Sequence, residues 1–237
     1  MNIALILSGG SGKRLGADIP KQYIIAGGRM LITECLGRVV SHPGIDRVQI
    51  VAHEEWHETI LEDLRESYAD ETIEDKIAGF SKPGDTRQLS ILNGMKDIAA
   101  YADPEDVLLI HDAARPLISS DQISACLKAC EEHDGAMPVL PMKDTVYASV
   151  DGKTVSELLD RKRIYAGQAP EAFRLGKYLS ANEALLPDKI LQINGSTEPA
   201  VMGGMDIAMI PGDENNFKIT TAKDLERYES ICASWSK

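Results

Sequence analysis

The chain has 237 residues, a length that corresponds to one large domain or two small ones. Hydrophobic residues make up 43% and charged residues 26%, an ordinary globular balance that excludes a disordered chain, a collagen and a coiled coil. The formal net charge of −12 argues against a general nucleic-acid-binding protein, which would be basic, but it leaves room for a local basic pocket.

Short apolar runs alternate with amphipathic stretches from the first residues to Gly135. The apolar runs predict buried strands at residues 3–7, 47–52, 73–78 and 106–110. The amphipathic stretches predict helices at residues 31–40, 54–68, 87–100 and 119–133. This alternation predicts an α/β fold in which a mostly parallel sheet has helices on both faces.

The pattern changes after Gly135 to shorter strand candidates, at residues 136–140, 145–150 and 154–158. Asp151-Gly152 between the last two is a hairpin signal, and an inserted hairpin has edges to cover. We therefore expect a β-arm at about 142–169 that pairs with a second subunit. A helix at 172–184, strand-like segments at 204–210 and 218–220 and a last helix at 221–230 complete one domain spanning 1–237.

Neither the N-terminus nor the cysteines indicate a special environment. Residues 1–7 lack a basic start and are too short for a signal peptide or a membrane span, so we expect a cytoplasmic protein without a membrane partner. The cysteines have no CxxC spacing, which favours reduced thiols that pack as small hydrophobic groups; they are Cys35, Cys126, Cys130 and Cys232.

The first chemistry-bearing segment is LSGGSGKRLG at residues 7–16, followed by Pro-Lys-Gln at 20–22. Glycines after a first strand let successive backbone N–H groups approach phosphate oxygens. The spacing matches neither a P-loop nor a dinucleotide fingerprint. The remaining alternatives are a phosphate-binding loop with its own cations, Arg14 and Lys21, or a plain glycine turn with solvated charges.

The second segment is VLLIHDAARP at residues 107–116. Asp112 follows an apolar strand at the edge of the sheet where ligands bind in open α/β folds. A carboxylate there suits Mg²⁺, and Arg115 suits a phosphate, although a surface Asp–Arg pair is the alternative. We expect His111 to be structural. The third segment, GDTRQLSILNG at 84–94, alone indicates only a loop that leads into a helix.

Together these segments resemble the cytidylyltransferases that act on 2-C-methyl-D-erythritol 4-phosphate and, in a sister branch, on ribitol 5-phosphate. The resemblance covers nearly the whole chain. Its motifs are GGSGKR at 9–14, PKQY at 20–23, GDTRQLSILNG at 84–94, HDAARP at 111–116, KDT at 143–145, DR at 160–161 and NNFKITTAKDL at 215–225.

The resemblance implies a Rossmann-like nucleotidyltransferase fold whose protruding β-arm forms a homodimer. CTP and a polyol phosphate are the implied substrates and Mg²⁺ the implied cofactor, with no nucleic-acid partner. The implied catalytic groups are Arg14, Lys21, Arg161 and Lys218. The implied nucleotide-binding residues are Ser8, Gly9, Gly10, Gly12, Gly84, Asp85, Ser90, Asp112 and Ala113, with Asp112 as the metal ligand. The implied acceptor-binding residues are Arg115, Thr145, Arg161 and Lys218, with Arg161 reaching across the dimer.

Two departures from the methylerythritol pattern concern the acceptor. Ala169-Pro170-Glu171 stands where Thr-Pro-Gln is expected, and Glu198-Pro199 stands where Asp-Glu is expected and predicts a rigid turn. They favour ribitol 5-phosphate slightly over methylerythritol 4-phosphate. A transferase that uses UTP or GTP, and a nucleotide-binding protein without catalysis, are the more remote alternatives.

Overall fold

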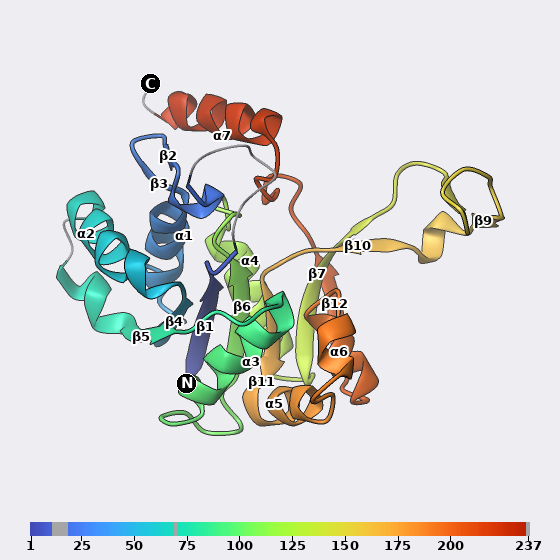
Figure 1. Ribbon diagram of the computed structural model, residues 1–237, viewed down its shortest axis with the longest axis horizontal. Helices are drawn as coiled ribbons and strands as arrows, with labels where there is room; N and C mark the ends of the chain where they lie inside the picture. The colour runs from blue at the N-terminus through green and yellow to red at the C-terminus, as the bar shows by residue number, and fades with distance from the viewer. Residues whose placement is uncertain (11–18, 69–70, 236–237) are drawn as a thin grey trace.

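The centre of the molecule is a mixed sheet (Figure 1). It is seen in a computed structural model that describes residues 1–10, 19–68 and 71–235. The strands follow the order β10-β7-β11-β6-β1-β4-β5. β12 lies off this path and pairs with β7 in parallel. Their bounds are β1 Asn2–Leu7, β4 Arg47–Val51, β5 Ile77–Ser81, β6 Val107–Asp112, β7 Gly135–Pro141, β10 Tyr165–Gly167, β11 Glu171–Arg174 and β12 Ile207–Pro211. Only β10 and β11 run against the others, so the predicted mostly parallel sheet is confirmed.

β1 lies in the middle and pairs in parallel with β4 on one side and β6 on the other. Its alternate side chains face opposite sides of the sheet, so Ala4 and Ile6 join one hydrophobic cluster and Ile3 and Leu5 join the other. A strand buried on both faces is a continuous apolar run, as the sequence of β1 is.

Helices cover both faces, as expected. One layer contains α1 (Leu31–Val40), α2 (His57–Ser67) and α4 (Ser120–Ala129). The opposite layer contains α3 (Arg87–Ile98), α5 (Leu175–Glu183) and α6 (Thr197–Met202). Short 3₁₀ turns cover Lys21–Tyr23, Glu54–Trp56, Glu71–Lys76, Arg161–Arg163 and Lys189–Gln192.

Four predicted elements are wrong in kind or position. The strand-like segment expected at 218–220 has no regular secondary structure. The strand expected at 73–78 begins only at Ile77, because Ile73 packs into the core from a 3₁₀ turn. The helix expected at 172–184 begins as β11, because the apolar run there pairs with β6 and β7 before the chain turns. Glu198-Pro199 lies in the first turn of α6 instead of a rigid turn, and Pro199 is tolerated there because first-turn N–H groups lack a helical partner.

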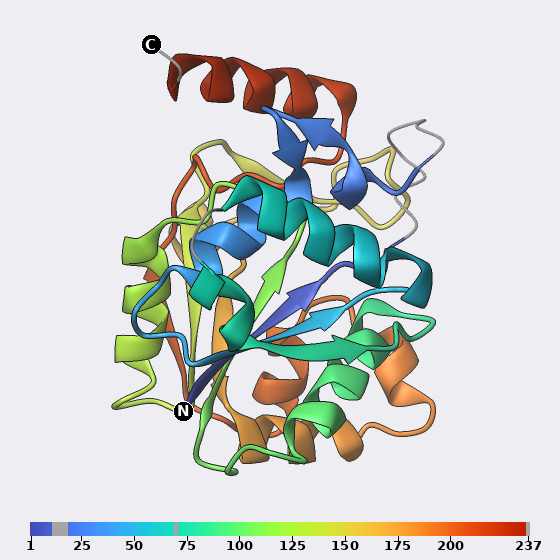
Figure 2. The same ribbon diagram turned by 90° about the vertical axis from the view of Figure 1, so that its left-hand side faces the viewer.

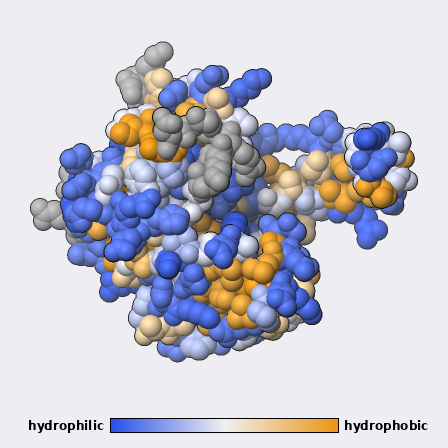
Figure 3. Space-filling view, viewed as in Figure 1, coloured by the Kyte–Doolittle hydropathy of each residue, from blue (hydrophilic) through white to orange (hydrophobic). Residues whose placement is uncertain are grey.

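A thin arm extends sideways from the body (Figure 1). It contains the hairpin β8 (Val146–Ala148) and β9 (Glu157–Leu159), and its chain returns through β10. The carboxylate of Asp151 accepts the backbone N–H groups of Lys153 and Thr154, both at 2.8 Å, and so closes the predicted hairpin turn. Apolar side chains lie exposed along the arm (Figure 3); they include Tyr147, Val150, Val155, Leu158 and Tyr165.

The last helix, α7 (Ala222–Trp235), lies across the small hairpin of β2 (Ile25–Ala26) and β3 (Arg29–Met30) (Figure 2). Tyr228 and Cys232 pack there with Leu31 and Ile219 in a third apolar cluster. The contact fixes the segment 216–221, which leads from the sheet to α7. Within the described ranges, no helix combines the length and the apolar character needed to cross a bilayer.

Candidate functional site

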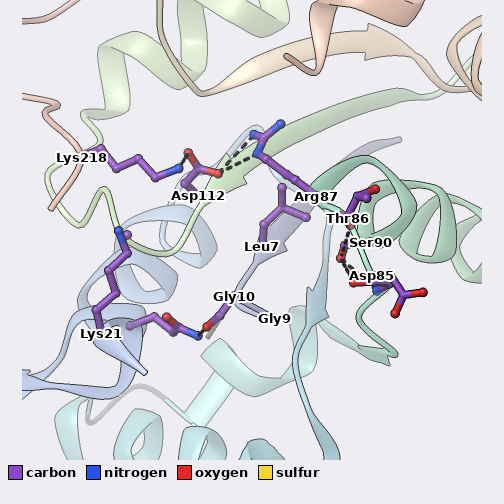
Figure 4. A pocket seen from close by; sticks show the side chains of 13 residues that line it. Leu7, Gly9, Gly10, Lys21, Asp85, Thr86, Arg87, Ser90, Asp112 and Lys218 are labelled. Carbon is purple, nitrogen blue, oxygen red and sulfur yellow. Dashed lines mark hydrogen bonds and ion pairs between the residues drawn. The ribbon is translucent and has the colours of Figure 1, made fainter. Parts of the chain in front are cut away.

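A pocket of about 570 Å³ opens at the carboxyl ends of β1 and β6 (Figure 4). These strands are in register, with Leu7 opposite Asp112, and the order of strands reverses at β1, which is where open α/β sheets bind ligands. Lining residues come from segments far apart in the sequence: Leu7, Gly9, Gly10, Lys21, Gln22, Gly84, Asp85, Thr86, Arg87, Ser90, Asp112, Ala114 and Lys218.

The start of the glycine loop is held by side chains beneath it. Gln22 Nε2 donates to the carbonyl oxygens of Ser8 and Gly10, at 2.6 and 2.7 Å. A Cβ on Gly9 would lie 2.6 Å from the ring of Pro83, so only glycine fits there. This close approach aligns the loop after β1 with the loop after β5.

Asp112 is buried and faces three cationic side chains. Its Oδ1 accepts from Arg87 Nη2 at 3.1 Å, its Oδ2 accepts from Lys218 Nζ at 2.9 Å, and Arg115 Nε lies 3.7 Å away. Burial alone raises the pKa of Asp112, but the charges of Arg87, Lys218 and Arg115 together hold that pKa well below its usual range. Asp112 is therefore a permanent anion in a cationic surrounding.

The C-terminal segment supplies the opposite wall. Lys21 Nζ donates to the carbonyl oxygen of Ile219 at 2.5 Å, and Arg115 Nη1 donates to that of Asn216 at 2.7 Å. Asp224 accepts the backbone N–H groups of Thr220 and Thr221 and so fixes the start of α7. The segment thereby brings Lys218 over Asp112 and close to Lys21 (Figure 4).

The other end of the pocket is polar, and Asp85 is its charged residue. Ser90 Oγ accepts the backbone N–H of Gly84 at 3.0 Å, and a Cβ on Gly84 would meet the Ser90 nitrogen at 2.9 Å. Thr86 caps α3 by accepting the N–H of Leu89 at 3.1 Å. Asp85 and Ser90 lie at the end away from Lys21 and Lys218, so the pocket has an acidic-to-polar end and a cationic end (Figure 4).

The pocket collects most of the predicted nucleotide-binding residues, namely Gly9, Gly10, Gly84, Asp85, Ser90 and Asp112, together with Lys21 and Lys218. Ser8 and Ala113 lie beneath it, since Ser8 bonds to Tyr23 and the Ala113 N–H bonds to the Leu7 carbonyl. Arg115 stands behind Asp112. Gly12 and Arg14 lie outside the described residues.

Thr145 and Arg161 are not at this pocket. They line a second cavity of about 500 Å³ on the arm, together with Leu158, Leu159, Asp160 and Lys162. Arg161 Nη1 donates to the Lys143 carbonyl at 2.6 Å and is otherwise exposed. Within one chain, the predicted acceptor-binding residues are thus divided between two places.

Sequence reasoning did not assign roles to Arg87, Gln22, Thr86 and Ala114, which also line the pocket. For Arg87 a signal existed: it is the first residue of a helix that begins directly after a glycine turn. Its partner Asp112 is distant in sequence, so only the packing of α3 against the sheet at β1, β4 and β5 reveals the pair.

Asp112 could serve a Mg²⁺ ion as a single carboxylate ligand. No group of three or more His, Cys, Asp or Glu side chains suited to a metal occurs among the residues described. Magnesium commonly takes one or two carboxylates and completes its shell with water and substrate phosphates. An always-ionised Asp112 on the pocket wall matches that requirement.

His111 is fully buried, and Nε2 lies 3.0 Å from the Arg115 carbonyl oxygen. Burial lowers its pKa to about 4. Its ring fixes the turn that carries Arg115, and it does not line the pocket, so the expected structural role fits its position.

A mostly parallel sheet with a glycine loop and clustered cations at its carboxyl edge defines a Rossmann-like nucleotidyltransferase fold. The chain belongs to the IspD family, described as 2-C-methyl-D-erythritol 4-phosphate cytidylyltransferase, whose model matches residues 2–234. The suspected resemblance is thereby confirmed at the level of the family.

Similar proteins carry both acceptor names. A 2-C-methyl-D-erythritol 4-phosphate cytidylyltransferase of Geobacter metallireducens is 32% identical, with 96% of each chain covered. A ribitol-5-phosphate cytidylyltransferase of Streptococcus pneumoniae is 30% identical, with 98% of each chain covered. The solved structure of a 4-diphosphocytidyl-2C-methyl-D-erythritol synthase of Anaerococcus prevotii has a TM-score of 0.81 at 25% identity, covering 98% of this chain and 96% of that one.

Other relatives are longer proteins. The chain spans 55% and 56% of the bifunctional IspD/IspF enzymes of Paramagnetospirillum magneticum and Rhodospirillum rubrum, to which it is 33% and 34% identical over 95% and 96% of its own length. The shared region is therefore one unit of those larger enzymes.

Proposed function

We propose that this protein transfers CMP from CTP to a sugar-alcohol phosphate, forming a CDP-polyol and releasing pyrophosphate. The observation that supports the proposal most is the ring of Arg87, Lys218 and Lys21 around and beside Asp112, at the end of a glycine loop. Family membership is its second support.

The reaction needs no general base, because the nucleophile is a phosphate oxygen that is already anionic at neutral pH. The acceptor oxygen forms a bond to the α-phosphorus of CTP while the bond from that phosphorus to the pyrophosphate oxygen breaks. The obstacle is to bring two polyanions together and to stabilise the charge that grows in this displacement. A cationic pocket with no histidine among its described lining residues suits such chemistry.

We assign the CTP phosphates to the loop of Ser8, Gly9, Gly10 and Gly12, and the growing charge at the α-phosphate to Arg14 and Lys21. The cytosine and ribose would lie at the polar end, framed by Gly84, Asp85 and Ser90, with Ala113 supporting the floor. The change along the pocket from a polar end to a cationic end supports this direction. We assign Arg14 and Gly12 from the sequence motif alone.

Asp112 is the residue that would hold Mg²⁺, which supplies charge neutralisation for the phosphates when bound. Lys218 and Arg87 keep the Asp112 carboxylate ionised and directed into the pocket. The protein's own contribution at this point is therefore orientation and a fixed negative charge.

We assign the acceptor phosphate to Lys218, Arg115, Thr145 and Arg161. Thr145 and Arg161 lie on an arm that leaves the body, so we propose a homodimer in which the arm of one subunit completes the site of the other. Exposed apolar side chains along the arm, such as Val150 and Leu158, support burial against a second copy.

For the acceptor we retain a slight preference for ribitol 5-phosphate. Ala169 lacks a hydroxyl donor. It is connected to Arg115 through Asn216, whose side chain donates to the Ala169 carbonyl and whose backbone carbonyl accepts from Arg115. A change at position 169 is thus close to a residue assigned to the acceptor. Glu198 and Pro199, which do not line the pocket, no longer support the preference.

The alternative is 2-C-methyl-D-erythritol 4-phosphate, supported by relatives of that name. Pyrophosphate release, measured with Mg²⁺, each nucleoside triphosphate and each acceptor, tests the proposal. We expect release only with CTP and a polyol phosphate. Nucleotide binding without release in every mixture would indicate a non-catalytic protein.

A further inference from the structure

Glu171 is a buried carboxylate beside the pocket that the reaction as proposed does not use. It is the first residue of β11, opposite Ile110 in the neighbouring strand and therefore close to Asp112 at the same edge of the sheet. It does not line the pocket. A buried carboxylate is costly unless its charge is satisfied, so its partners indicate what it does.

Two hydroxyl groups and one arginine satisfy this carboxylate. Ser196 Oγ donates to Oε2, Thr197 Oγ1 donates to Oε1 at 3.0 Å, and Arg87 Nη2 lies 3.9 Å from Oε2. Burial raises the pKa of Glu171, and the charge of Arg87 and the two hydroxyl bonds act against that rise. Arg87 is the only cation among the ion-pair partners that the described residues give to Glu171.

Ser196 connects the two charged groups. Arg87 Nη1 donates to Ser196 Oγ at 2.6 Å, and the same hydroxyl donates its proton to Glu171. The loop that carries Ser196 is itself fixed, because Tyr178 donates to the Ser196 carbonyl at 2.6 Å. Arg87 is thus held on one side by Asp112 and on the other by Ser196 and Glu171.

The Arg87 guanidinium therefore has a carboxylate on each side, Asp112 on one and Glu171 on the other. Without the second carboxylate, Asp112 would be the only anionic partner of Arg87 among the described residues. Arg87 would then compete with Lys218 and with any cation for the Asp112 oxygens. We propose that Glu171 is a positioning residue that acts through Ser196 to hold Arg87 at the pocket wall, so that the guanidinium paired with Asp112 keeps a fixed orientation toward the nucleotide phosphates. The inference rests on the proposed function, because the phosphates are those of CTP.

A double-mutant cycle tests it. We would compare the wild type, Glu171→Gln, Arg87→Ala and the double variant for the Kd of CTP with Mg²⁺, by calorimetry, and for kcat and KM of CTP. Glu171→Gln keeps the shape and removes the charge. Its amide oxygen can accept from one of the two hydroxyl groups, while its NH2 group can only donate to the other. We expect it to weaken CTP binding and kcat/KM by about ten-fold in the presence of Arg87 and by less than about two-fold in its absence. Equal losses in both backgrounds, or no loss in either, would overturn the inference.

Ser196→Ala and Thr197→Val form a matched pair, since each removes one hydroxyl from the same carboxylate but only Ser196 also contacts Arg87. We expect Ser196→Ala to reproduce Glu171→Gln and Thr197→Val to remain within about two-fold of the wild type. Equal effects of the pair would mean that the cluster only stabilises the loop, which contradicts the inference. Ser196→Ala also serves if Glu171→Gln fails to fold, as judged by its Tm.

The measurement of CTP binding separates the two claims. If the wild type binds CTP but releases no pyrophosphate with any acceptor, the proposed function fails, while the Glu171–Arg87 coupling is still read from Kd. If the wild type turns over normally and the coupling is absent, only the inference about Glu171 fails.

Discussion

Arg87 and Asp112 are 25 residues apart in the chain, yet Nη2 of Arg87 lies 3.1 Å from Oδ1 of Asp112 at the edge of the central sheet. The helix that begins at Arg87 and the strand that ends at Asp112 bring the pair together. The pair sits at the cationic end of the pocket, so the roles of its members can be separated by substitution.

Asp112→Asn should fold and lose most of its turnover. The amide keeps the size of the side chain but removes the negative charge that Lys218 and Arg87 surround and that suits Mg²⁺. We expect kcat to fall by about 10²–10³, the usual effect of one charge-stabilising group. Near-wild-type turnover at saturating Mg²⁺, with unchanged circular dichroism, would contradict the assignment of Asp112 as the metal ligand.

Lys21→Ala should lower kcat more than it raises the KM for CTP, because Lys21 is assigned to charge that grows during the reaction. Its ammonium also bonds to the Ile219 carbonyl, so Lys21→Met is the matched variant that keeps the length of the side chain. Arg14→Ala should behave alike. A change confined to KM in both positions would make these residues ground-state binders.

A mixture of two inactive variants tests the arm. If the partner subunit's arm completes each site, hybrid dimers of Arg161→Ala and Lys21→Ala contain one site with both native residues. Random exchange then restores about a quarter of the sites. Before this experiment, sedimentation of the wild-type protein should show that it is a dimer. No recovery despite demonstrated subunit exchange would mean that one chain builds its own site.

His42 should make stability depend on pH. Its Nδ1 accepts the Gly44 N–H at 3.0 Å, so the ring is neutral and Nε2 donates to Ser124 at 2.9 Å. Burial first, and then the charge of Lys76, lower its pKa below the ordinary 6.5. The unfolded chain therefore takes up the proton first, so this stabilisation is complete above about pH 6.5 and is lost as the pH falls toward the folded pKa.

The measurement is urea unfolding of the wild type and His42→Asn between pH 7.5 and 5. The wild type should lose up to about 1.4 kcal/mol per pH unit more than the variant in this range. Contributions from His111 cancel in the difference. Parallel pH profiles for the two proteins would show that His42 does not titrate differently on folding.

The sequence predicted the elements with strong periodicity and missed those whose pattern is ambiguous. The helix expected at 31–40 is α1 with the same bounds, because its apolar face repeats cleanly and β-turn residues follow it. Ala172 and Phe173 instead form a strand, since a short apolar run suits a buried strand and a buried helix equally. Only the pairing with β6 and β7 decides between them.

The candidate site divides in the same way. Glycines and charges in short motifs, such as Gly84 and Lys21, were predicted to bind the nucleotide, and they line the pocket. Arg87 and Glu171 were not assigned, because their significance depends on contacts across 25 residues and more. The separation of Thr145 and Arg161 from the pocket depends on the direction in which the arm leaves the body, which local sequence does not encode.

The most direct test of the account is pyrophosphate release by the purified protein with Mg²⁺ and CTP, with kcat/KM measured separately for ribitol 5-phosphate and 2-C-methyl-D-erythritol 4-phosphate. We predict turnover that requires both CTP and a polyol phosphate, with ribitol 5-phosphate the better acceptor. A ten-fold or greater advantage, about 1.4 kcal/mol in the transition state, for methylerythritol 4-phosphate would contradict the acceptor assignment. No CTP-dependent release with either acceptor would contradict the central claim itself.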